Sequence, residues 1–381
     1  YNGKVGLNIR YDAAISEPEN GDYPSRLSIG ADYLIGSGTK LFMVQEFTDS
    51  DEASTRNTRV GIKTSPWAGA TVNADVSREN SENGDRVFSN IGVDQSFAIT
   101  NKLSASIGGE HSRTLRNNVE GRVGGSTAPS GSASEDFTAI SIGLGYNEEN
   151  WSVSNRLEYK TSDTEDTWNW FIGYYAERQD EYGFSLGARL GLTDKNDSDE
   201  QNRTADINLG FVMRRRPSRW TMLDKLELEY DDTTGTSNDQ STRKLINNLV
   251  LNYRHNINTQ ISLNYGAKYV RQTINGDTYS GFTDLLGAEI RRDFGFGKNR
   301  LWDWSAHGDV LHTHEDDVYD YSFGVELGRV IMRNLRVGVG YNIEGFKDED
   351  LDFDRYRKRG PCGIARLKLD QGTFSDILGA R

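Results

Sequence analysis

Residues 261–269 read Ile-Ser-Leu-Asn-Tyr-Gly-Ala-Lys-Tyr, and this stretch decides the fold because apolar and polar side chains alternate along it. Successive side chains of a β-strand point to opposite faces, so a strand with this sequence has one apolar face and one polar face. The same alternation occurs at residues 5–11, 27–33, 184–190 and 335–343. Almost no stretch has the period of an α-helix, so the sequence predicts an all-β protein.

Stretches of this kind occur about twenty times, and each is roughly ten to fourteen residues long. So many meandering strands exceed what an open twisted sheet usually tolerates, and closure into a barrel removes the sheet edges. In a bilayer closure is obligatory, because no water satisfies an open edge. The sequence therefore predicts a closed up-and-down antiparallel transmembrane β-barrel of about 20 strands (about 18–22) over residues 1–370, with a C-terminal tail at 371–381.

The predicted connectors alternate in length along the chain. Tight turns at Ser37-Gly38, Thr100-Asn101 and Arg333-Asn334 alternate with longer polar segments such as 14–24 and 347–357. Short periplasmic turns and long extracellular loops are typical of bacterial outer-membrane barrels. Both chain ends are expected on the short-turn side, which requires an even number of strands.

The polar face of the predicted strands carries many charged side chains, which are costly against lipid but cheap against water or when paired across strands. The residues predicted to line a lumen are Arg10, Asp32, Arg156, Glu158, Arg189, Glu227, Arg254, Lys268, His307, Asp309, Arg336, Glu344, Arg366 and Lys368. Two interpretations of this face are open, a solvated wall with cross-strand ion pairs and a surface that conducts a substrate.

Aromatic side chains lie near the ends of the predicted apolar faces, where outer-membrane barrels carry two aromatic girdles. The predicted girdle residues are Tyr11, Tyr33, Tyr146, Tyr159, Tyr230, Tyr253, Tyr269, Trp151, Trp220 and Trp302. The expected location is the outer membrane of a Gram-negative bacterium, and the expected partners are its lipid and lipopolysaccharide.

A barrel of this size encloses a wide hole, because about 16–18 strands already leave an aqueous channel and about 22 need a plug. Segment 114–135 is the internal candidate for a constriction, with Arg116, Asn118, Glu120 and Arg122 as its polar residues. The sequence therefore predicts a wide export or translocation channel, gated or plugged by this loop or by a periplasmic or surface protein partner. The alternatives are a membrane anchor of a larger surface protein with a sealed lumen, and a general diffusion porin.

The composition argues against several other classes of protein. The formal net charge of −13 argues against nucleic-acid binding, and a single cysteine excludes a disulfide scaffold. His312 and His314 precede an acidic run and resemble metal ligands, but no further His or Cys lies nearby in the sequence, so neither a metal site nor a cofactor is predicted. Histidine is scarce, with 5 in the chain, and an enzyme is not predicted.

The alternating strands, the connector lengths and the aromatic positions together resemble the Gram-negative outer-membrane β-barrel class over nearly the whole chain. A second resemblance lies near the C-terminus, at Val339-Gly340-Tyr341-Asn342, Phe346, Asp350 and the run Tyr356-Arg357-Lys358-Arg359-Gly360. These residues are similar to the last hairpin of the C-terminal barrel modules of large surface and export proteins. That resemblance implies that the barrel is one module of a longer chain with extracellular or periplasmic domains.

Overall fold

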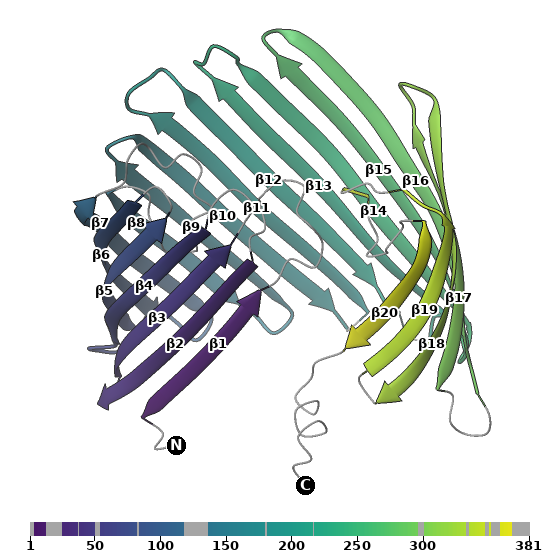
Figure 1. The fold of residues 1–381 in the computed structure, drawn as a ribbon, viewed down its shortest axis with the longest axis horizontal. Helices are drawn as coiled ribbons and strands as arrows, with labels where there is room; N and C mark the ends of the chain where they lie inside the picture. Colours follow the sequence, from purple (N-terminus) through teal and green to yellow (C-terminus); the bar gives the residue numbers. More distant parts are fainter. Residues whose placement is uncertain are drawn as a thin grey trace. The chain divides into compact units, whose positions relative to one another are not determined.

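The computed structural model describes residues 4–12, 25–36, 38–49, 54–81, 84–117, 136–179, 181–215, 217–295, 301–332, 335–346, 350–351 and 359–367. Within these residues the chain forms twenty β-strands and no helix (Figure 1), so the prediction of an all-β protein is confirmed. In the same ranges no helix is long and apolar enough to cross a membrane.

The strands range in length from 8 to 18 residues. In chain order they are β1 (Val5–Asp12), β2 (Ser25–Gly36), β3 (Thr39–Asp49), β4 (Ser54–Thr64), β5 (Ala70–Ser81), β6 (Gly84–Ala98), β7 (Leu103–Asn117), β8 (Phe137–Asn147), β9 (Trp151–Ser162), β10 (Glu165–Arg178), β11 (Tyr182–Lys195), β12 (Gln201–Met213), β13 (Trp220–Thr234), β14 (Gln240–Asn256), β15 (Thr259–Ile274), β16 (Asp277–Phe294), β17 (Trp302–Thr313), β18 (Val318–Met332), β19 (Leu335–Glu344) and β20 (Gly360–Leu367).

The chain divides into two compact units. The first comprises Tyr1–Glu148, Val153–Ile172 and Gly191–Asn202, and the second comprises Glu149–Ser152, Gly173–Leu190 and Arg203–Arg381. In the first unit β1 to β8 pair in chain order, each strand antiparallel to the next. In the second unit β13 to β20 pair in the same way. The predicted up-and-down meander is therefore confirmed within each unit.

The strand registers divide the side chains of each unit into two faces, because directly opposite residues of paired strands point to the same side. Strand β17 illustrates both faces. Trp304 and Val310 are 37% and 36% exposed, whereas the alternating Asp303 and Asp309 are 2% and 3% exposed. We call these the apolar face and the polar face. A soluble sheet buries its apolar face, so this distribution is the reverse of that in a soluble protein.

Several strands extend further than the alternation of apolar residues predicts. Strand β7 continues to Asn117, so the segment predicted as a loop from residue 114 begins later, and β13 and β14 pair as far as Thr233 and Gln240. The reason is that a hydrogen-bonded ladder continues through polar residues once the register is fixed, whereas the sequence pattern records only the half-buried part of a strand.

Two connectors that stand where the alternation of connector lengths would place a longer segment are tight turns. Asp163 and Thr164 join β9 to β10, and Asn275 and Gly276 join β15 to β16. Asn275 and Gly276 have φ angles of 52° and 91°. Positive φ at both central residues is the requirement of a type I′ hairpin turn, which Asn-Gly satisfies. The strict alternation of short and long connectors therefore does not hold at these two positions.

Candidate functional site

The polar face of the first unit contains a cluster of buried polar side chains that hydrogen bonds join in part. Asp75, Asn90 and Ser112 are directly opposite one another on β5, β6 and β7, and all three are buried. The Asn90 Nδ2 and the Ser77 hydroxyl both donate hydrogen bonds to Asp75 Oδ2, each at 3.1 Å. The Asp75 carboxylate thus accepts two hydrogen bonds, and polar groups line this face although these side chains are buried.

A pocket of about 400 Å³ lies on the same face and contains both charge signs. Asp94 and Glu110 line it from β6 and β7, and Arg156 and Glu158 line it from β9. Arg156 Nη2 lies 2.9 Å from Glu158 Oε2, and Arg156 is itself exposed. The pocket therefore offers polar and ionic contacts to a hydrophilic solute.

The two described ends of the predicted constriction segment are held together. The backbone N–H of Thr114 on β7 donates to Asp136 Oδ1 at 2.5 Å, and Arg86 Nη2 lies 3.4 Å from the same oxygen. Burial by itself raises the pKa of the Asp136 carboxyl, but the hydrogen bonds from Thr114 and the charge of Arg86 outweigh it, so this pKa lies below its usual value. These contacts hold Thr114 of β7 and Asp136, the residue before β8, close together.

The polar face of the second unit holds a charge cluster on β16 to β19. Arg336 Nε donates to both carboxylate oxygens of Asp303, at 3.1 and 2.9 Å. Arg291 Nη2 lies 3.2 Å from Asp303 Oδ2, and Glu326 Oε2 lies 3.6 Å from Arg336 Nη2. Asp303 and Arg336 are only 2% and 7% exposed, so removing either one would leave a buried charge without its main partner.

An apolar cluster interrupts this polar face. Ile246, Leu285 and Leu311 come from β14, β16 and β17, and their registers place them among polar-face residues. Leu351, from the connection between β19 and β20, packs against them and is fully buried. Its Cδ2 lies 3.0 Å from where a Cβ of Gly266 would stand, so this glycine makes room for it.

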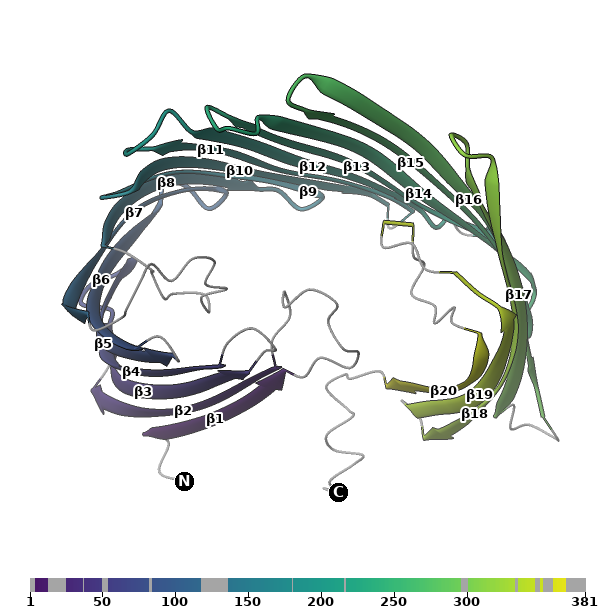
Figure 2. The same cartoon turned by 45° about the horizontal axis from the view of Figure 1, so that its top comes forward.

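Polar contacts hold the neighbouring residue of the same segment. Asn248 Nδ2 donates to the backbone carbonyl of Asp350 at 3.2 Å, and Lys268 Nζ lies 3.3 Å from Asp350 Oδ2. These two contacts come from the paired strands β14 and β15 (Figure 2). A second pocket, of about 740 Å³, lies beside Asp350 over β11 to β14 and is lined by Lys225 and Glu227 among others. The described part of the β19–β20 connection therefore lies on the polar face of its own unit.

The registers place most of the predicted lumen residues on the polar faces. In the first unit Arg10 is opposite Ser28, and Asp32 lies 3.2 Å from Lys40. The face also includes Arg156 and Glu158, whose side chains line the first pocket described above. Arg189 is an exposed residue of β11.

In the second unit the registers place the following predicted residues on the polar face: Glu227, Arg254, Lys268, His307, Asp309 and Arg336. Arg366 is opposite Arg336 in the backbone register, and Lys368 lies outside the described residues. Glu344 is different. A register shift within β19 pairs it with Phe323, a residue of the apolar face.

The predicted girdle residues are placed on the apolar faces wherever a register is known. Tyr11, Tyr33 and Tyr269 are 66%, 48% and 42% exposed. The rings of Trp220 and Tyr253 are in contact at a tilt of 37°, with centroids 4.7 Å apart. Trp151 and Tyr159 both belong to β9. The ring of Tyr159 lies 4.6 Å from that of Trp168 on β10. The strand registers place the remaining predicted girdle residues on the apolar face: Tyr146, Tyr230 and Trp302.

The constriction residues of the sequence prediction separate into two groups. Arg116 is a strand residue of β7 whose guanidinium pairs with Asp85, so it is not part of a loop. Asn118, Glu120 and Arg122 lie outside the described residues. Sequence reasoning missed the segment at Asp350 and Leu351, although a lone leucine in an acidic run, together with Leu285 and Leu311 at polar-face positions, was a usable signal.

The comparisons with known proteins are limited to solved structures, since no family model and no curated protein matches the chain. A bacterial polysaccharide outer membrane secretin is similar over 86% of this chain and 97% of its own, with 10% identity and a TM-score of 0.36. A loop-deletion mutant of OmpT, an outer membrane protein of Vibrio cholerae, matches over 84% and 95%, with 12% identity and a TM-score of 0.33. The siderophore receptor PirA from Acinetobacter baumannii matches over 89% and 68%, with 10% identity and a TM-score of 0.41. These similarities concern the fold alone.

The chain has the burial pattern of a protein whose β-sheet meets lipid on one side. Its exposed apolar faces and buried polar faces suit a β-sheet that contacts lipid on one side, and β-strands of this kind are how outer-membrane proteins cross their bilayer.

Proposed function

We propose that the chain is an outer-membrane channel in which the strands close into one barrel, with the apolar faces against lipid and the polar faces around water. The observation that carries this proposal is the reversed burial along single strands, such as exposed Trp304 beside buried Asp303 on β17. Such a sheet is stable only where lipid covers the apolar side.

The strand number supports a wide channel. The twenty strands found in the described residues exceed the about 16–18 strands of barrels that already leave an aqueous path. The polar faces offer a passing solute charges of both signs, as at Arg156 and Glu158 or at Lys225 and Glu227. We therefore favour export or translocation of a hydrophilic substrate, with short turns on the periplasmic side and longer loops outside. Gating would come from the segment after β7 or from a protein partner.

The alternative is a membrane anchor with a sealed lumen, and the position of Leu351 on the polar face favours it. A segment that lies on this face occupies part of any path along it. The two functions differ in one measurable property, which is conductance.

Single-channel recording of the refolded full chain in a planar bilayer tests the proposal. A large, steady conductance is expected, and folding is checked separately by heat-modifiable migration in electrophoresis. A folded chain that stays electrically silent would overturn the open-channel function and support the anchor.

A matched pair of charge reversals tests which face lines the path. Arg254→Glu alters an exposed polar-face arginine of β14, and Arg271→Glu alters an exposed apolar-face arginine of β15. Because charges along a pore set its ion selectivity, Arg254→Glu should shift the reversal potential toward cations. Arg271→Glu should leave it unchanged, and the opposite ranking would contradict the proposed orientation.

A further inference from the structure

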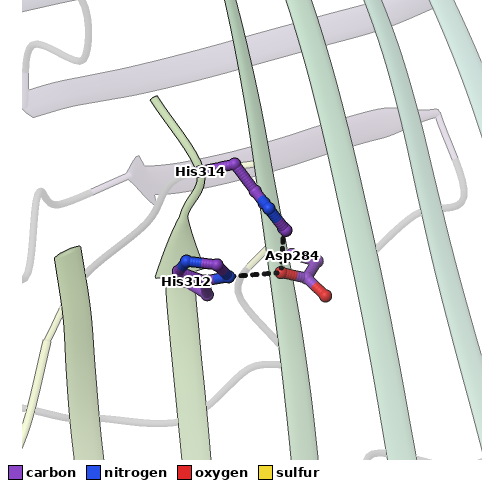
Figure 3. Close-up of side chains that lie close together, drawn as sticks. All are labelled: Asp284, His312 and His314. Carbon is purple, nitrogen blue, oxygen red and sulfur yellow. Dashed lines mark hydrogen bonds and ion pairs between the residues drawn. The ribbon is translucent and has the colours of Figure 1, made fainter. Parts of the chain in front are cut away.

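Two histidines and an aspartate converge at one end of β16 and β17. Asp284 and His312 are directly opposite each other in the β16–β17 register, and His314 follows two residues later in the chain. The ligand atoms of all three side chains lie within 4.8 Å of one another. Figure 3 shows both imidazole rings directed at the same carboxylate.

The distances suit one shared ion. His314 Nε2 lies 3.0 Å and His312 Nδ1 lies 3.8 Å from Asp284 Oδ1. Ligands at about 2.0–2.1 Å around a tetrahedral zinc ion stand roughly 3.3 Å from one another. The two nitrogen-to-carboxylate separations lie on either side of that value, and all three ligand atoms lie within 4.8 Å of one another, so the side chains would draw closer together around one ion.

The unused nitrogen of His312 has the partner that metal-bound histidines usually have. His312 Nε2 lies 3.2 Å from Asp317 Oδ1, which leaves Nδ1 to face Asp284. A carboxylate on the far nitrogen fixes the tautomer and makes the imidazole a better ligand. Asp317 has a φ of 50°, a left-handed conformation that aspartate tolerates in turns.

Aromatic rings and backbone bonds hold the two histidines in place. The ring of His312 stacks on Tyr319 at 4.1 Å with an interplanar angle of 5°, and the ring of Phe282 lies 4.8 Å from that of His314. The backbone N–H of His314 donates to the carbonyl of Phe282 at 3.0 Å. The carboxylate of Glu315 accepts a hydrogen bond from the backbone N–H of Phe282. We therefore do not include Glu315 among the ligands.

The three side chains are partly exposed. On the apolar face, the pair Asp284 and His312 comes directly after the pair Leu286 and Val310 along the β16–β17 ladder. It lies next to the turn that follows β17. Their side chains are 29% and 20% exposed, and that of His314 is 42% exposed. An ion held by three protein ligands here would keep an open position for water or another ligand.

We propose that Asp284, His312 and His314 form a binding site for a divalent transition-metal ion of the zinc and copper type. Two imidazoles and one carboxylate are the donor set that these ions accept, whereas magnesium and calcium prefer all-oxygen sites. This site is independent of the channel function, because it lies on the apolar face rather than on the polar face.

The test is zinc binding to the untagged, refolded full chain in detergent, measured by titration calorimetry. One equivalent of Zn²⁺ should bind, and His314→Ala and Asp284→Asn should each weaken binding at least tenfold. Asp317→Asn should weaken it by about 10-fold, the lower end for loss of an outer carboxylate. The matched control is His111→Ala, which removes an exposed strand histidine whose Nδ1 lies 2.9 Å from the Thr138 hydroxyl and should leave zinc affinity unchanged.

Copper gives a second readout at the same site. The electron paramagnetic resonance spectrum of one bound Cu²⁺ should show splitting from two nitrogens in the parent chain and from one nitrogen in His314→Ala. The proposal is overturned if the folded parent chain binds no zinc, or if His314→Ala and His111→Ala bind it equally.

Discussion

Replacement of Leu351 by alanine tests whether the β19–β20 connection is docked on the polar face. Leu351 is 0% exposed and packs on Ile246, Leu285 and Leu311. The substitution removes three buried carbons, which at about 0.8 kcal/mol per methylene gives roughly 2.4 kcal/mol, within the usual range for a buried leucine. The Lys268 contact and the Asn248 hydrogen bond to Asp350 remain, so docking should weaken without disappearing.

Limited proteolysis measures this change directly. Trypsin sites follow Leu351 at Arg355, Arg357, Lys358 and Arg359. When opening is fast compared with cleavage, the cleavage rate follows the population of the open form. A loss of roughly 2.4 kcal/mol should therefore accelerate cleavage in this segment about 50-fold, because each 1.4 kcal/mol is tenfold. Fragments are quantified by mass spectrometry on chains that migrate as folded.

Leu263→Ala is the matched control. Leu263 lies on β15, the strand that carries Gly266 and Lys268, but it is on the apolar face and is 42% exposed. The Leu263→Ala substitution should leave the rate of trypsin cleavage unchanged. If Leu351→Ala and the parent chain are cleaved at the same rate, or if Leu263→Ala is cleaved as fast as Leu351→Ala, the docking of this segment is refuted.

Three further substitutions test other parts of the fold by urea unfolding in lipid vesicles. Ile107→Arg places a charge on the apolar face of β7, where Ile107 is 49% exposed, and should lower the free energy of unfolding by about 2–4 kcal/mol. The control, Ser106→Arg, changes the adjacent residue on the polar face and should lower it far less. The reverse order would contradict the assignment of faces. Arg336→Ala leaves buried Asp303 with a single cation and should cost about 3 kcal/mol, so a loss below about 1 kcal/mol would show that the cluster adds little. Gly276→Val forces a branched side chain into a φ of 91° and should cost about 1–2 kcal/mol, and an unchanged unfolding midpoint would contradict the type I′ turn.

The alternation of apolar and polar residues was sufficient to predict the strands and their two faces. Residues 261–269 lie within β15, and the exposed apolar Leu263 and Tyr265 alternate there with buried Asn264. This prediction succeeded because side-chain direction along a strand is a local property with a period of two.

Alternation becomes unreliable where a strand contains an irregularity. Glu344 has the same parity as Asn342, yet the register skips one residue between Asn342 and Glu344 and pairs Glu344 with Phe323. A bulge inserts one unpaired residue and reverses every side chain beyond it. The sequence of β19 contains no proline or turn signal at this point, so only the pairing with β18 reveals the reversal.

The cluster of Asp284, His312 and His314 shows a second limit of the same reasoning. The sequence shows two histidines one residue apart, but Asp284 precedes His312 by more than twenty residues and joins them only through the β16–β17 register. A ligand set drawn from two strands depends on the register, which is set by the whole hairpin and not by either segment.

The sequence by itself determined the all-β class, the number of strands and the alternation of apolar and polar faces, because each of these follows from local side-chain chemistry repeated along the chain. The tertiary structure decided which residues face each other across strands: Arg336 with Asp303, Leu351 with Leu285, and His312 with Asp284. These contacts join positions far apart in the chain, and their partners are selected by strand register and by burial, which are properties of the assembled sheet.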